Sequence, residues 1–554
     1  MKLSVCATLI SLSLMVGCQS TSLPSTDSST SISIPEPISA VQTPVQVSES
    51  YEQICPTLGI QPVTVSVSDF WSEGEVITDA YSGNIAPVKN GTVTLTPSRH
   101  SGGVLLLESQ AKKSSFDWHS ATFYYVATDR FYNGNSWNDH SYGRQESKYG
   151  FKGGDIAGLT QKLDYLAELG VDVLWISTPL EQVHGWLPSE YGNNPVYPYV
   201  GGSTLDWTEL DTNMGSEQEM RAFVDLAHQL GMKVIWSMDT EPSKPTLADL
   251  QQFDIQPNQE ANLPSYWNEW QPKEGENLTH YLDEFKDENG QVSEWWPEVW
   301  FTHSQSKKIA SENTKFNDSV VPEFFFNKPT TKVTLSHQTK DELLTQWITS
   351  WVTEFGIDGI VLAQSTPELT YKIEQAGNDA FKQWKESNPY KAVELSSFQV
   401  IDLDKPNHSI VKSFPIEQYQ QGCLTISNYQ EMEQSLPSLT TLTWFDQENK
   451  PELSSGNYAQ YRDSASALLL SEGSALIWYG DESAKSGDIY SEMNWDEMTG
   501  LRLSLQSHWK KLLAFRSNHS SLSNGEKKMV KNSPYYAFTR ENSTDKVMVV
   551  YTGE

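Results

Sequence analysis

Residues 351–369, WVTEFGIDGIVLAQSTPEL, decide the fold. Glu354 to Gly356 are typical of a helix end, with Gly356 in the position of a C-terminal cap. Residues 358–363, DGIVLA, then indicate a short buried strand that carries no charge after Asp358. A helix end, a glycine, an apolar strand and a new loop follow one another in each unit of a (β/α)8 TIM barrel. This is an α/β fold whose chemistry lies where the strands end.

The strand at 359–363 resembles strand four of the α-amylase family, which is glycoside hydrolase family 13. That family writes the strand roughly as GhRhDxxxxH, where h is an apolar residue. In this chain the arginine position holds Val361, and the position of the nucleophilic aspartate holds Ala363. The resemblance therefore implies a barrel whose central strand has lost its nucleophile.

The composition limits the class of partner. The chain has 554 residues, enough for several domains, and a formal net charge of −32 from 71 acidic and 39 basic residues. Such an acidic chain is not expected to bind nucleic acid or anionic lipid through a charged face, and it fits neutral ligands. Its 19 Trp and 24 Tyr residues indicate either a large aromatic core or stacking platforms for sugars, and composition leaves both open.

The N-terminus has the pattern of a bacterial lipoprotein signal. Lys2 precedes an apolar run that ends MVGC, with Cys18 as the lipidated residue, and an ordinary signal peptide is the alternative. We expect a signal over 1–17 and a disordered Ser/Thr/Pro-rich tether over 18–50. Gln19 resembles an outer-membrane sorting signal. The prediction is a protein of the bacterial cell envelope, in the periplasm or at the surface. Only the lipid on Cys18 would attach it to the membrane.

Two cysteines outside this signal, Cys55 and Cys423, remain in the mature chain, whereas Cys6 leaves with the signal. In an exported protein such a pair favours a disulfide bond. Two buried free thiols are the alternative, and the spacing leaves both open.

The rest of the chain resembles the periplasmic α-amylases of enteric bacteria, nearly to its C-terminus. The patterns predict a leading β domain over 51–115 and an amylase-type barrel over 116–520. They also predict a long Trp-rich insertion after strand three, at about 239–339, and a short C-terminal β domain over 521–554. The eight barrel strands are expected at 122–127, 171–177, 233–236, 358–363, 398–402, 424–427, 439–443 and 475–479. Helices are expected at 155–169, 217–229, 341–353, 376–385 and 503–517.

The other catalytic positions also differ from the family. Its retaining enzymes use two carboxylates about 5 Å apart, a nucleophile and an acid/base. The resemblance puts the acid/base position at Leu403, which lies between Asp402 and Asp404. The third family acid matches Asp446, and Phe445 stands where its partner histidine would be. The implication is a pseudoenzyme, and the alternative is an active α-amylase that uses Asp402 or Asp404 with Asp446.

Two sugar-contacting motifs have changed as well. A tyrosine in the family pattern HGY after strand two corresponds to VGG at 200–202. The DxxxNH motif of strand three, a calcium and sugar contact in the family, corresponds to SMDTEP at 237–242. Differences in all four barrel motifs favour the loss of glycosidase chemistry over a single misalignment.

The loop after strand one keeps a functional pattern. The sequence DRFYNGNSWND at 129–139, followed by FKGGD at 151–155, resembles the calcium loop of cyclodextrin-forming relatives. Amide, carboxylate and backbone carbonyl oxygens suit Ca²⁺, and an Asn/Gly-rich turn without metal is the alternative. The ligands implied by the resemblance, with Gly153 through its carbonyl, are Asn133, Asn135, Asn138, Asp139, Gly153 and Asp155.

Sugar binding is expected at the mouth of the barrel. HGW at 184–186 follows strand two, so His184 and Trp186, together with Asp446, are the expected substrate-binding residues. We therefore expect an envelope lipoprotein of the α-amylase family that binds α-glucan or maltooligosaccharide without hydrolysing it. The alternatives are the active α-amylase and an interaction scaffold that binds no sugar.

Overall fold

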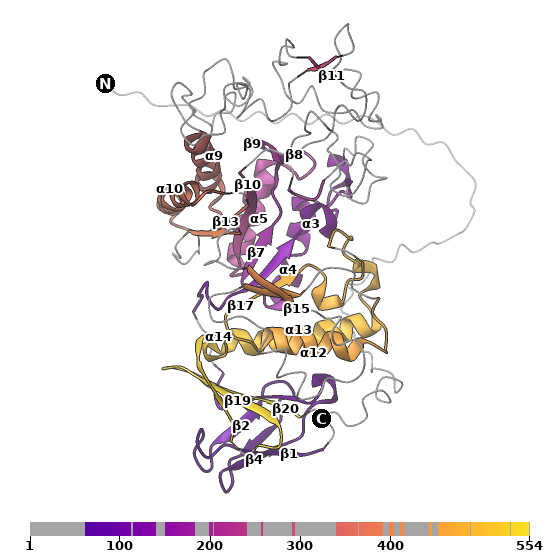
Figure 1. The fold of residues 1–554 in the computed structure, drawn as a ribbon, viewed down its shortest axis with the longest axis vertical. Coiled ribbons are helices and arrows are strands. Elements are labelled where there is room, and N and C mark those ends of the chain that lie inside the picture. The colour runs from indigo at the N-terminus through magenta and orange to yellow at the C-terminus, as the bar shows by residue number, and fades with distance from the viewer. Residues whose placement is uncertain are drawn as a thin grey trace, which may run out of the picture. The chain divides into compact units, whose positions relative to one another are not determined.

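A computed structural model describes most of the chain between residues 61 and 552 (Figure 1). The described residues are 61–111, 115–139, 150–182, 199–240, 256–258, 291–293, 340–391, 398–403, 410–414, 442–445 and 452–552, apart from the single positions 203, 364, 488 and 532. Within these residues, no helix is both long enough and apolar enough to cross a membrane. The expected signal, the tether and both mature cysteines lie outside the described residues.

Eight parallel strands form the central sheet. In chain order they are β6 (Thr122–Val126), β7 (Val173–Ile176), β10 (Lys233–Asp239), β13 (Gly359–Ala363), β14 (Gln399–Asp402), β15 (Ile410–Phe414), β16 (Leu442–Phe445) and β17 (Ser474–Trp478). Their order in the sheet is β14-β13-β10-β7-β6-β17-β16-β15, with every neighbouring pair parallel. Strands that follow in sequence are neighbours, except that no pairing joins β14 to β15 among the described residues, and the first strand pairs with the last. This is the cyclic order of a (β/α)8 fold of α-amylase type, as predicted.

One expected strand was placed wrongly. We predicted strand six at 424–427, which lies outside the described residues, whereas the strand beside β16 is β15 at Ile410–Phe414. In β15 the β-branched pair Ile410–Val411 is followed by Lys412 and Ser413, so the local strand signal is weak. Pairing with β16 decides the conformation, as tertiary context often does for short strands. The other seven strands agree with the prediction to within a few residues.

Helices alternate with these strands. They are α2 (Thr128–Phe131), α3 (Ile156–Gln161), α4 (Leu163–Leu169), α5 (Glu217–Gln229), α9 (Lys340–Phe355), α10 (Pro367–Ser387), α12 (Tyr458–Leu469), α13 (Gly500–Asn518) and α14 (Ser520–Asn524). Helix α5 has the predicted bounds because residues next to its start form an N-terminal cap. Ser216 accepts from the amide of Glu219, and the Glu219 carboxylate accepts from the amide of Ser216, which is a capping box.

The unit around strand four confirms the opening prediction. Gly356 ends α9 with a φ of +73°, and a Cβ at this position would lie 2.1 Å from the Trp384 ring. Only glycine meets both conditions. After it, the buried Asp358 carboxylate accepts from His228 Nε2 at 2.7 Å and from the Val234 amide at 2.9 Å, and Lys233 Nζ lies 3.2 Å away. Asp358 therefore ties the base of strand four to α5 and β10.

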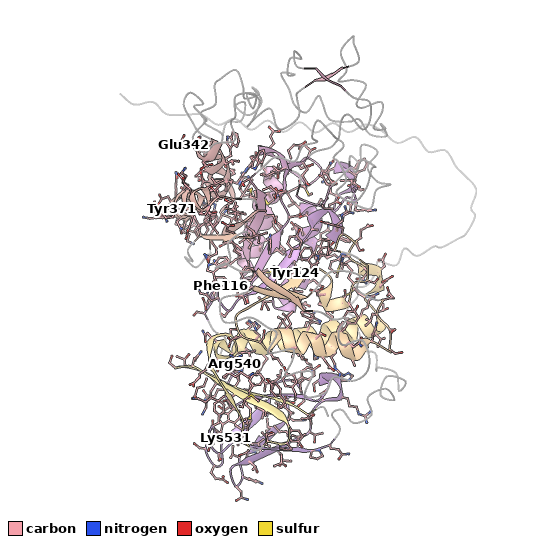
Figure 2. The ribbon with its side chains drawn as sticks, viewed as in Figure 1. Phe116, Tyr124, Glu342, Tyr371, Lys531 and Arg540 are labelled. Atoms are coloured by element: carbon pink, nitrogen blue, oxygen red, sulfur yellow. The ribbon has the colours of Figure 1, made fainter. Side chains whose placement is uncertain are left out.

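The barrel strands separate two cores, because successive side chains of a strand point to opposite faces. Inner side chains form one cluster that includes Phe123, Trp175, Ile235, Val361 and Leu476. The alternating outer side chains join the large cluster beneath the helices. Tyr124, labelled in Figure 2, is such an outer residue and donates to Glu482 at 2.9 Å.

The leading and C-terminal β pieces, which the sequence analysis treats as separate, share one antiparallel sheet. Its order is β18 (Glu526–Met529), β19 (Tyr536–Glu541), β20 (Lys546–Tyr551), β5 (Val104–Glu108), β2 (Val76–Asp79) and β3 (Ile85–Pro87). Strands β5 and β20 join the two pieces, with Leu106 opposite Val549. Strands β1 (Val63–Ser66) and β4 (Thr92–Leu95) form a separate pair. Two further small sheets pair β8 (Leu180–Gln182) with β9 (Thr204–Leu210), and β11 (Gln256–Asn258) with β12 (Gln291–Ser293).

Candidate functional site

A pocket of about 470 Å³ lies at the carboxyl ends of the barrel strands. Six neighbouring strands, from β14 round to β17, contribute to it, and the loop before β9 adds Gly201. The lining residues are Tyr125, Trp175, Gly201, Ser237, Met238, Asp239, Val361, Ala363, Leu403, Leu476 and Trp478. The pocket occupies the place where barrel enzymes carry their chemistry, and its volume is typical of a small-molecule site.

The two positions predicted to have lost catalytic carboxylates both line this pocket. Ala363 ends β13, and Leu403 follows β14, with its amide donating to the Leu362 carbonyl at 3.0 Å. Val361, in the arginine position of the family pattern, lines the pocket as well. The structure therefore brings the altered positions together in one apolar site.

Of the alternative catalytic acids, Asp402 is described, and it does not line the pocket. Asp402 is 1% exposed and lies on the outer face of β14, where Thr370 Oγ1 of α10 donates to its carboxylate at 2.7 Å. It does not line the pocket, because it is the strand neighbour of Leu403 and faces the other way. Asp404 and Asp446 lie outside the described residues, as do His184 and Trp186.

Sequence reasoning missed a carboxylate in this pocket. Asp239 ends β10 opposite Ala363, and burial raises the pKa of its carboxyl group to about 7. Trp207 Nε1 donates to its backbone carbonyl, not to its side chain. We predicted that strand three ends at Trp236. A strand extended to Asp239 would have placed Ser237 and Asp239 on the inner face, because side chains alternate between the two faces.

Three aromatic side chains form a continuous wall on one side of the pocket, and they were also missed. The ring centroid of Tyr125 lies 4.2 Å from that of Trp478 and 5.0 Å from that of Trp175. Trp175 Nε1 donates to Ser237 Oγ at 2.8 Å, which fixes the indole beside β10. These rings come from strands eight, one and two, so only closure of the sheet brings them together.

Gly201 and Gly202, in the stretch predicted to replace the family's tyrosine motif, lie beside the pocket. Gly201 has a φ of +85°, its amide donates to Gln182 Oε1 at 3.0 Å, and a Cβ there would lie 2.3 Å from Ser177 Cβ. Gly202 is exposed, and a Cβ built on it would lie 3.9 Å from Asp239 Oδ2. No side chain on these two residues therefore covers Asp239.

The loop after strand one gathers most of the expected calcium ligands. Asn133 Nδ2 donates to Asp139 Oδ2 at 2.8 Å, and a Cβ on Gly153 would lie 2.6 Å from that amide nitrogen. Asp139 Oδ1 and Asn138 Oδ1 are buried oxygen atoms without a hydrogen-bond donor among the described residues. Buried oxygens that lack donors fit a cation, because an oxygen atom buried without a partner is otherwise costly.

Asp155, in contrast, is already well supplied with donors. The amides of Gly134 and Gly158 donate to Oδ1 at 2.9 and 2.6 Å, and Asn135 N and Asn138 Nδ2 donate to Oδ2 at 2.9 and 3.3 Å. Its carboxylate thereby caps the start of α3 and closes the loop. Within the described residues, no group of three or more His, Cys, Asp or Glu side chains could hold a metal, so an ion here would need amide and backbone oxygens beside the Asp139 carboxylate.

Comparison with known proteins decides the family. Residues 125–363 match the family model described as "Alpha amylase, catalytic domain". The periplasmic alpha-amylase of Escherichia coli strain K12 is 33% identical over 578 residues, which covers 93% of this chain and 84% of the relative. The chain belongs to the α-amylase family. The differences predicted at Ala363 and Leu403 would therefore be departures within a family member.

More distant members of the α-amylase family also align with the chain. The Beta/alpha-amylase of Paenibacillus polymyxa is 23% identical, covering 78% of this chain and 33% of that protein. Among solved structures, the alpha-amylase from Geobacillus thermoleovorans complexed with acarbose is 15% identical. It has a TM-score of 0.45 and covers 79% of this chain and 87% of that one.

Proposed function

We propose that this α-amylase-family protein is an envelope lipoprotein that binds α-glucan or maltooligosaccharide and does not hydrolyse it. The observation that carries the proposal is the joint presence of Ala363 and Leu403 in the pocket at the barrel mouth. Retaining glycosidases need a nucleophile and an acid/base about 5 Å apart; alanine cannot attack the sugar as a nucleophile, and leucine cannot give or take a proton. Loss of a catalytic unit costs on the order of 10⁶ in rate in well-studied hydrolases.

The described carboxylates support this proposal over the active alternative. Asp239 is the single carboxylate among the described residues that line the pocket, and a two-carboxylate mechanism needs a partner for it. Asp402 faces away towards Thr370. The active alternative therefore depends on Asp404 and Asp446, whose positions are not described.

Stacking is the expected source of sugar binding. The relative that is 33% identical to this chain is a periplasmic alpha-amylase. The aromatic wall of Tyr125, Trp175 and Trp478 offers rings at the barrel mouth, and Trp186 is the candidate from the loop after strand two. Because the charge-assisted contacts of the cleavage site are missing, we expect a dissociation constant of roughly 10 µM to 1 mM.

Calcium would stabilise the loop after strand one. Asn138 and Asp139 would supply side-chain oxygens, Asn133 and Asn135 amide oxygens, and Gly153 its carbonyl. Asp155 would hold the loop in place without contacting the ion, since its carboxylate already accepts four hydrogen bonds. The ion would add stability and no chemistry of its own to the pocket.

The direct test of sugar binding is a titration of the mature protein with maltoheptaose, followed by Trp fluorescence and calorimetry. We expect saturable binding in the stated range, weakened by Trp186→Ala. The absence of binding at millimolar sugar would favour the interaction scaffold. The anchor is tested separately: labelled palmitate should enter the wild type and not Cys18→Ala, and equal labelling would rule out the lipid.

A further inference from the structure

The pocket contains one carboxylate among its described lining residues. Asp239 is half-buried at the end of β10, and among the described residues no side chain or amide donates to its carboxylate. No lysine, arginine or histidine is among the described residues that line the pocket. A buried carboxylate without compensation is costly, so proteins normally pair such a group or leave it for a ligand.

The walls on either side of Asp239 offer few hydrogen-bond partners. Strands β17, β6 and β7 supply Trp478, Tyr125 and Trp175 on one side. Strands β13 and β14 supply aliphatic side chains on the other side, among them Ala363 and Leu403. A sugar ring carries several hydroxyl groups that need partners. These walls offer mainly Asp239 and Ser237 Oγ, and that oxygen already accepts from an indole.

An organic ammonium ion matches this combination. Its positive charge is attracted both to a carboxylate and to aromatic rings, and its alkyl groups tolerate apolar walls. The net charge of −32 adds a field that draws cations towards the protein. The volume of about 470 Å³ accommodates a ligand of this size.

We propose that the barrel-mouth pocket binds a small organic ammonium ion, with the cationic nitrogen beside Asp239 and its alkyl groups against Tyr125, Trp175 and Trp478. This site uses Asp239, which lies within the strand-three motif at a position that the family pattern leaves unspecified, and it does not depend on glucan binding. Asp239 lines the pocket, and a Cβ built on the exposed Gly202 would lie 3.9 Å from Asp239 Oδ2.

Binding of this kind depends on pH. Burial raises the pKa of Asp239 to about 7, so the carboxylate is mostly ionised at pH 8 and mostly protonated at pH 6. Tyr125 is the titratable group of β6 that faces Asp239. Burial first, and then the nearby Tyr490 and Asp239, raise the pKa of Tyr125, so it stays neutral over this range. Strands β7, β13, β14 and β17 contribute no titratable side chain to the described lining. Affinity for the cation should therefore rise about tenfold from pH 6 to pH 8.

The test is a calorimetric titration of the mature protein with choline at pH 8 and low salt. The matched ligand is 3,3-dimethylbutan-1-ol, which has the shape of choline without its charge. We expect saturable choline binding with a dissociation constant below about 10 mM, and binding of the alcohol at least tenfold weaker. Equal binding of the two ligands, or no choline binding at 50 mM, ~5 times that limit, would overturn the proposal.

Two variants test whether choline binds beside Asp239. Asp239→Asn keeps the shape of the side chain and should weaken choline binding at least tenfold and remove its pH dependence. Asp164→Asn removes an equal charge from the exposed face of α4 and should bind choline as the wild type does. If Asp239→Asn and Asp164→Asn weaken choline binding equally, the effect is one of net charge and the proposed site is wrong. Maltoheptaose, titrated in parallel, reports on the glucan proposal independently.

Discussion

The base and the mouth of the barrel each hold a carboxylate, and the two have opposite surroundings. At the base, Asp358 has His228, Lys233 and the Val234 amide around its carboxylate. Burial alone would raise its pKa, but these partners outweigh burial and lower it. At the mouth, burial acts on Asp239 without opposition and raises its pKa to about 7. The difference indicates that stability lies at the base, whereas the mouth is left free for a ligand.

The largest expected effect is a difference in stability between variants of the two carboxylates. Asp358→Ala leaves His228 and Lys233 without their shared buried partner, which should lower the free energy of unfolding by about 3–5 kcal/mol. Asp239→Asn removes an unpaired charge from the mouth and should leave stability unchanged or raise it slightly at pH 8. Urea unfolding of both variants against wild type measures this. A similar loss in the two variants would contradict the division between base and mouth.

The loop after strand one also contains buried oxygens without a donor among the described residues, and we expect these oxygens to bind a metal ion. If Asn138 Oδ1 and Asp139 Oδ1 await Ca²⁺, adding the ion at 100 times its dissociation constant should stabilise the fold by about 2.7 kcal/mol. Chelation with EDTA should reverse the gain, and Asp139→Ala should abolish the response to both treatments. The melting temperature measures each effect.

Asp155→Ala is the informative control for calcium. Its donors come from the chain itself, so this variant should lose about 1 kcal/mol from the missing helix cap whether or not calcium is present. A wild-type melting temperature that ignores both calcium and EDTA would leave the loop as a metal-free turn.

A smaller effect concerns His519, a second fully partnered buried group. Its Nε2 lies 2.5 Å from Glu108 Oε2 on β5, and its Nδ1 lies 2.9 Å from Asp545 Oδ1 before β20, so it clamps the two halves of the shared sheet. Burial opposes the charge on His519, but the carboxylates of Asp545 and Glu108 outweigh it and raise its pKa. Burial likewise opposes the charge on Asp545, but His519 and the Ser521 hydroxyl and amide lower its pKa.

The signs of these two shifts define a pH window. A raised histidine pKa stabilises the fold below the unfolded pKa of about 6.5, and this is lost as the pH rises through the folded pKa. A lowered aspartate pKa stabilises the fold above about 3.9, and this is lost as the pH falls through its folded value. The stability difference between wild type and His519→Gln should therefore be about 1–2 kcal/mol smaller at pH 9 than at pH 6. An unchanged difference would show that the clamp carries no charge.

The parts of the fold that were predicted correctly have local causes. Short local patterns specify two helix ends: Gly356 ends α9, and the capping box of Ser216 and Glu219 begins α5. The pairing of β5 with β20 joins segments more than 400 residues apart, and no local pattern reports it. Strand six was misplaced for the same reason, because pairing with β16 outweighs its own weak propensity.

The site divides in the same way. Ala363 and Leu403 could be located from the sequence because the family pattern supplies their register. Asp239 and the wall of Tyr125, Trp175 and Trp478 could not, because the family pattern assigns them no role. They meet only when the parallel sheet is wound into its cyclic order.

The central claim is that the barrel mouth binds without hydrolysing. Purified protein incubated with maltoheptaose over a day, with products resolved by chromatography, tests it most directly. We predict no shorter maltooligosaccharide above the level of a protein-free control, at both pH 6 and pH 8. Ala363→Asp combined with Leu403→Glu should not restore full activity, because Val361 still occupies the arginine position. Wild-type product that disappears in Asp239→Asn or Asp446→Asn would contradict the claim and identify an acid that still performs catalysis.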